Sequence, residues 1–97
     1  MNAHSASAAE KQFLINMPRQ LQALKKHIDQ RDAGSAGNQA HAIKGAAANV
    51  GGIALSAVAD EMEKAGKAGR PEEITALMPE LERQFNLLRA KMREGKP

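Results

Sequence analysis

The sequence contains no cysteine, tryptophan or tyrosine, and two phenylalanines are its only aromatic residues. The lack of cysteine excludes disulfides and thiolate metal sites, and it is consistent with a reducing cytosol. No stretch of about 18 apolar residues occurs, so no helix is expected to span a bilayer. Residues 1–10 are small and polar and lack the basic and apolar segments of a secretory signal peptide. We therefore expect a cytoplasmic domain that makes no membrane contact.

The apolar residues that are present favour helices. Ala, Leu, Ile, Val and Met supply most of them in this chain of 97 residues, and β-branched residues are sparse. A chain of this length forms one domain with a modest core. Two series recur at helical steps of three and four residues: Phe13, Met17, Leu21, Leu24 and Ile28, and later Ile74, Leu77, Met78, Leu81, Phe85, Leu88 and Met92.

Prolines and glycines divide this helical pattern. Pro18 predicts a short helix over about 7–17 and a longer one over 18–30, with one kinked helix as the alternative. Glycines at 51–52 end the next helix, and Gly66 and Gly69 bracket a later loop. Pro71 begins the last helix, in which Pro79 predicts a kink or a boundary.

These elements predict an all-α fold, namely an antiparallel up-and-down four-helix bundle with a short additional N-terminal helix. Short loops make successive long helices antiparallel neighbours. Residues 1–9 are expected to form a flexible tail or linker, and residues 10–95 the helical bundle domain. Because the apolar stripes close on one another, we expect a monomer.

The net charge of +3 and the isoelectric point near 9.5 raise the question of nucleic-acid binding. Acidic and basic residues are mixed, however, as in Glu61, Glu63, Lys64 and Lys67, and such mixing is typical of a solvated helix face. We therefore expect no nucleic-acid partner. The histidines at positions 4, 27 and 41 are scattered, which makes a poor metal site. No phosphate-binding loop is present, so we expect the domain neither to bind ATP nor to phosphorylate itself.

The most informative stretch surrounds His41. At about 100° per residue, His41, Lys44, Gly45 and Ala48 share one helix face, opposite the apolar face that includes Ile43. An exposed neutral imidazole has a nitrogen lone pair that can attack phosphorus. Lys44 is a mobile point charge for the phosphoryl oxygens, and Gly45 leaves room for the incoming group. An exposed His/Lys pair also arises often by chance, and a helical glycine also serves close packing.

Residues 40–51, Ala-His-Ala-Ile-Lys-Gly-Ala-Ala-Ala-Asn-Val-Gly, closely resemble the signature of histidine-containing phosphotransfer (Hpt) domains. The family pattern is His-x-x-Lys-Gly, then small residues, then a glycine that ends the helix. The resemblance covers roughly residues 10–92 and includes Phe13-Leu14, Pro18, Leu21, Asp32 and the segment 55–63. It implies that His41 is the phospho-accepting nucleophile, that Lys44 stabilises the phosphoryl charge, and that Gly45 gives steric clearance.

The resemblance implies a phosphocarrier of two-component phosphorelays, which is not an enzyme and has no cofactor of its own. Such a domain accepts a phosphoryl group from the aspartyl phosphate of a response-regulator receiver domain and passes it to another receiver. The receiver supplies Mg²⁺. A free-standing carrier and the C-terminal module of a hybrid sensor histidine kinase are both compatible with the sequence. The alternative function is a non-phosphorylated helical docking module that binds and regulates a receiver or a histidine kinase.

Overall fold

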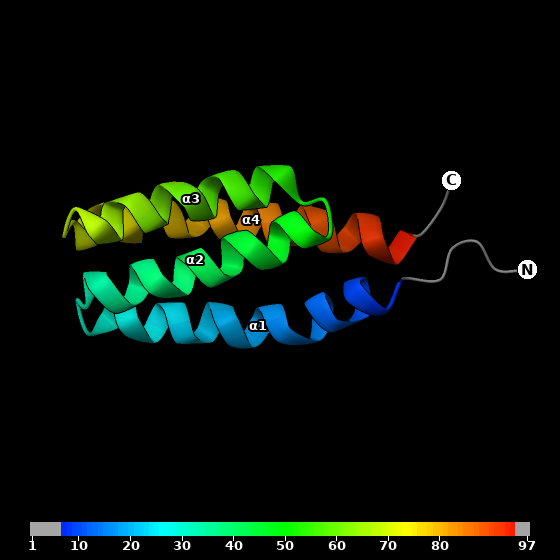
Figure 1. Cartoon of the computed structure of the whole chain (residues 1–97), viewed down its shortest axis with the longest axis horizontal. Coiled ribbons are helices and arrows are strands. Elements are labelled where there is room, and N and C mark those ends of the chain that lie inside the picture. The colour runs from blue at the N-terminus through cyan, green and yellow to red at the C-terminus, as the bar shows by residue number, and fades with distance from the viewer. Residues whose placement is uncertain (1–6, 95–97) are drawn as a thin grey trace, which may run out of the picture.

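The computed structural model describes residues 7–94, which form four helices and no strand. The helices are α1 (Ala8–Asp29), α2 (Ala33–Asn49), α3 (Ile53–Lys67) and α4 (Pro71–Glu94), joined by loops of three residues. They run alternately up and down, and the start of α1 and the end of α4 lie at the same end of the bundle (Figure 1). The predicted all-α four-helix bundle is confirmed. No helix within the described range is long and apolar enough to cross a membrane.

The predicted short N-terminal helix is wrong, because α1 continues through Pro18. A proline inside a helix costs about 3 kcal/mol or more, but Phe13, Met17, Leu21 and Leu24 form one buried stripe across it. A break after Met17 would take part of this stripe out of the core. Packing therefore overrides the local preference. In α4 the helix likewise continues through Pro79, so of the kink or boundary predicted there the boundary is wrong.

The N-terminus of α1 is closed by a capping box. Ser7 Oγ accepts a hydrogen bond from the Glu10 backbone N–H, and the Glu10 carboxylate accepts one from the Ser7 N–H. Because α1 begins at Ala8, positions 8 and 9 belong to the helix and not to the predicted tail. The rest of that tail, residues 1–6, lies outside the described residues.

The ends of α2 follow the sequence signals. Asp32 accepts a hydrogen bond from the Ser35 backbone N–H and thereby caps the helix that contains His41. Gly51 follows the helix with a φ of 77°, in the left-handed region where glycine is favoured. The start and end of the His41 helix are therefore set by local residues.

A single core fills the centre of the bundle. Most of the side chains predicted to face inward are buried, and Leu77, Leu88 and Met92 of the last series pack against the core while partly buried. The buried apolar residues are Phe13, Met17, Leu21, Leu24, Ala36, Ala40, Ile43, Ala47, Leu55, Ala59, Met62, Ala65, Ile74, Met78, Leu81 and Phe85.

Helices α2 and α3 form the closest pair, and two glycines lie at their contact. A Cβ atom on Gly66 would lie 2.5 Å from Gly37 Cα and 2.7 Å from the Ala33 carbonyl oxygen, so no side chain fits there. Gly66 is thus a buried residue inside α3 and not the start of a loop, as the sequence suggested. Gly37 lies four residues before His41. The two glycines therefore let α3 approach the helix face that carries His41.

Replacement of Gly66 by alanine is expected to lower the free energy of unfolding by about 1–3 kcal/mol, because the added methyl group overpacks the α2–α3 contact. The loss should occur although alanine is the better helix former. Urea unfolding of Gly66→Ala measures it. Gly34→Ala is the matched control, since the nearest atom to its Cβ is 3.8 Å away. Equal stability of Gly66→Ala and the wild type would contradict the close contact.

Candidate functional site

The exposed face of α2 carries the histidine singled out in the sequence. His41, Gly45 and Ala48 are exposed, whereas Ile43 and Ala47 on the opposite face are buried. The His41 side chain keeps 67% of its surface exposed. A Cβ on Gly45 would contact nothing within 4 Å. The surface beside the imidazole is therefore open to a large partner, as the helical spacing predicted.

A buried glutamate of α3 fixes the proton position on this imidazole. His41 Nδ1 lies 3.0 Å from Glu63 Oε2, and the Glu63 side chain is only 9% exposed. A carboxylate can only accept, so Nδ1 carries the hydrogen in this contact. In the neutral ring the lone pair is then on Nε2. Within residues 7–94 no hydrogen bond occupies Nε2. Nε2 is therefore the ring nitrogen that is left available to a partner.

Lys44 also contacts α3. Its Nζ lies 2.6 Å from Glu63 Oε1 and 3.2 Å from Asp60 Oδ1. The first contact is an ion pair without the alignment of a hydrogen bond, whereas the second is also a hydrogen bond. Glu63 and then Asp60 raise the pKa of Lys44 above its usual value. Lys44 is thus anchored between two carboxylates beside His41, and it is not the freely mobile charge that the sequence suggested.

The Glu63 carboxylate is ionised at neutral pH. Its pKa is lowered to about 2, first by Lys44 and then by His41 and Lys67, although burial opposes ionisation. Lys67 Nζ lies 3.2 Å from Oε2, the same oxygen that faces His41 Nδ1. The negative charge of Glu63 therefore faces Nδ1 of the imidazole. Lys44 contacts one oxygen of this carboxylate, and Lys67 contacts the other.

The sequence analysis missed Glu63, which it assigned to a solvated helix face. Glu63 is buried and belongs to the inward stripe of α3, four residues after Ala59 and three before Gly66. That register was the available signal, because a carboxylate inside an apolar stripe needs a charged or polar partner. Asp60 was missed as well. Ser56, one turn earlier, donates a hydrogen bond from its hydroxyl to the Lys44 carbonyl and joins α3 to α2.

The other histidines take no part in this cluster. His4 lies outside the described residues. His27 lies near the end of α1, beside Asp32 and Pro71. Within residues 7–94 no group of three or more His, Cys, Asp or Glu side chains is arranged to hold a metal ion.

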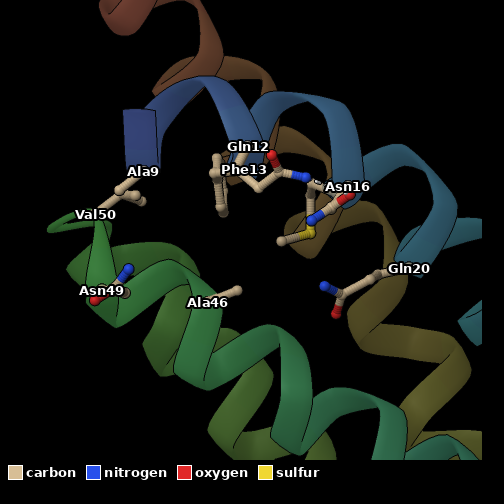
Figure 2. A pocket seen from close by; sticks show the side chains of 9 residues that line it. Ala9, Gln12, Phe13, Asn16, Gln20, Ala46, Asn49 and Val50 are labelled. Carbon is tan, nitrogen blue, oxygen red and sulfur yellow. Dashed lines mark hydrogen bonds between the residues drawn. The ribbon is translucent and has the colours of Figure 1, made fainter. Parts of the chain in front are cut away.

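A cavity of about 280 Å³ lies between α1 and α2. It is not lined by His41 or by the residues that contact His41 and Lys44. Figure 2 shows the amide side chains of Gln12, Asn16 and Gln20 on α1 opposite Ala46 and Asn49 on α2. Gln12 donates a hydrogen bond to the Asn16 side chain one turn further along α1. The candidate site is therefore the open face around His41 and not this cavity.

Comparison with known proteins agrees with the geometry. The family model described as Hpt domain matches residues 11–91, which is most of the chain. No curated protein and no solved structure matches the sequence.

Proposed function

Since the chain belongs to the Hpt domain family, we propose that it carries a phosphoryl group on Nε2 of His41 between receiver domains. Hpt domains are phosphocarriers, and not enzymes, of two-component signalling, and they interact with receiver domains and kinases. The single observation that most supports His41 as the carrier is its Nδ1–Glu63 contact, which leaves the lone pair on Nε2 of a side chain that is 67% exposed.

The proposed transfer is a displacement at phosphorus. The Nε2 lone pair forms an N–P bond while the P–O bond to the receiver's aspartate breaks, and that electron pair stays on the carboxylate oxygen. The ring then carries hydrogen on Nδ1 and phosphoryl on Nε2, so it gains positive charge. The Glu63 carboxylate at 3.0 Å stabilises this charge. In the reverse step a receiver carboxylate attacks phosphorus and the N–P electron pair returns to Nε2.

The surrounding residues have separate proposed roles. Glu63 orients the imidazole and selects its tautomer, so it is a positioning residue. Lys44 supplies positive charge to the phosphoryl oxygens, and Gly45 leaves space for the partner. As in other members of the family, the receiver is expected to contribute Mg²⁺ and most of the catalytic groups. Phosphoryl transfer depends chiefly on positioning and charge stabilisation, which His41 and the receiver can share. We further propose that the carrier works in the cytoplasm as a monomer.

Replacement of Gly45 by alanine is expected to stabilise the fold and slow the transfer. A mid-helix glycine costs about 0.5–1 kcal/mol relative to alanine, and the added methyl group meets no atom of the chain. The same methyl group occupies the surface next to His41 that a receiver approaches. Urea unfolding and the rate of label transfer from a phosphorylated receiver measure the two effects. Gly34→Ala should be no less stable than the wild type and transfer normally. A Gly45→Ala variant with wild-type transfer would refute the clearance role.

The function itself is tested with a receiver domain charged with radiolabelled acetyl phosphate in the presence of Mg²⁺. We expect label to move to the chain and to be acid-labile and base-stable, as phosphohistidine is. If several phosphorylated receivers transfer no label to the correctly folded protein, the alternative function of a non-phosphorylated docking module would replace the proposal. That module would bind a receiver equally well after His41→Gln.

A further inference from the structure

A second carboxylate lies close to the lysine that flanks His41. Asp60 Oδ1 is 3.2 Å from Lys44 Nζ, and its other oxygen, Oδ2, is 3.0 Å from Lys64 Nζ. The pKa of Asp60 is lowered by Lys64 first and by Lys44 second. Asp60 therefore forms ion pairs with two lysines. Lys44 belongs to the site around His41, and Lys64 is an exposed neighbour on α3. Glu63 already gives Lys44 a carboxylate partner, so the anchoring of Lys44 to α3 does not depend on Asp60 alone.

We propose that Asp60 is a positioning residue that lowers the stability of the phosphohistidine by competing with the phosphoryl group for Lys44. This inference rests on the proposed function. Once Nε2 is phosphorylated, the phosphoryl oxygens compete with Glu63 and Asp60 for the Lys44 ammonium group, while Lys64 and Lys67 remain paired with Asp60 and Glu63. The carboxylate of Asp60 also repels the phosphoryl group directly. Both effects favour breaking the N–P bond and moving the phosphoryl group to a receiver aspartate.

Lys64 makes this competition adjustable. It holds the second oxygen of Asp60 and is 75% exposed, so it neutralises part of the Asp60 charge without belonging to the core. Lys44, Lys64 and Lys67 oppose the carboxylates of Asp60 and Glu63, so these five side chains together carry one net positive charge beside the His41 ring. Loss of a carboxylate from this cluster therefore makes it more favourable for a phosphoryl group, and loss of a lysine makes it less favourable.

The test is the equilibrium ratio of phosphohistidine to aspartyl phosphate between the chain and a receiver domain that labels the wild type. Asp60→Asn is expected to shift this ratio about two- to tenfold toward the carrier. The shift is modest because only one negative charge is removed and the site is largely exposed to solvent. Lys64→Gln is expected to shift it the opposite way. Asp60→Glu, which keeps the charge, should stay near the wild-type ratio. The shifts should shrink as salt is raised to about 1 M, where screening is strong.

The control is Glu61→Gln, which removes a carboxylate from the neighbouring position of α3. Glu61 is exposed and forms no ion pair within the described part of the chain. The ratio of phosphohistidine to aspartyl phosphate should change less in Glu61→Gln than in Asp60→Asn. An unchanged ratio in Asp60→Asn, or a shift toward the receiver, would overturn the inference. Should that variant fail to fold, the opposite shift of Lys64→Gln still decides. A wild-type chain that takes no label would instead contradict the proposed function.

Discussion

Replacement of His41 by glutamine is expected to abolish labelling of the chain by a phosphorylated receiver. Glutamine fills a similar volume but has no nucleophilic nitrogen lone pair, so the N–P bond cannot form. His41 is two-thirds exposed and contributes no core contact, so the variant should unfold at a urea concentration close to that of the wild type. The measurement is acid-labile, base-stable label on the folded protein after incubation with the receiver.

His27→Gln is the matched control for this prediction. His27 lies on α1 beside Asp32 and outside the cluster around His41, so its replacement should leave the labelling intact. Equal label on His41→Gln and the wild type would show that another residue accepts the phosphoryl group. Loss of label in both variants would show that the assay depends on something other than the identity of the nucleophile.

Replacement of Glu63 by glutamine is expected to slow the acceptance of the phosphoryl group roughly tenfold, because an amide accepts a weaker hydrogen bond than a carboxylate. The amide oxygen can still accept from Nδ1, but the negative charge that opposes the developing imidazolium is lost. Lys44 also loses its nearest carboxylate. Single-turnover rates from a phosphorylated receiver measure the change. The affinity for the receiver should be little affected, since the Glu63 side chain is 9% exposed.

Glu61→Gln controls for the removal of a carboxylate from α3, and we expect it to accept phosphate at nearly the wild-type rate. A second readout separates positioning from simple destabilisation. In ¹⁵N spectra the neutral ring of the wild type should carry its hydrogen on Nδ1, whereas in Glu63→Gln that tautomer should become less dominant. A Glu63→Gln variant with wild-type kinetics and an unchanged tautomer would exclude the positioning role.

Local sequence signals predicted the parts of the structure that depend on neighbours in the chain. Helical spacing placed His41 on the exposed face and Ile43 in the core, and Gly51 marked the end of the helix. The break at Pro18 was wrong because a local cost was outweighed by a stripe of buried side chains on both sides of it.

The parts that were missed depend on contacts between α2 and α3. Glu63 follows His41 by 22 residues, and no local rule pairs them. Gly66 looked like a loop residue because its reason for being glycine is the approach of Gly37 on another helix. Sequence analysis thus singled out His41 through its exposed helix face, and the resemblance to Hpt domains implied its role as the nucleophile. The groups that set its tautomer and its charge became evident only from the packing of the two helices.

The most direct test of the account is the chemical form of the phosphorylated protein. The chain, labelled with ¹⁵N and phosphorylated by a receiver domain, is examined by NMR for coupling between phosphorus and the imidazole nitrogens. We predict coupling to Nε2 of His41, with Nδ1 still carrying its hydrogen opposite Glu63. Phosphorus bonded to Nδ1, or to a residue other than His41, would contradict the central claim.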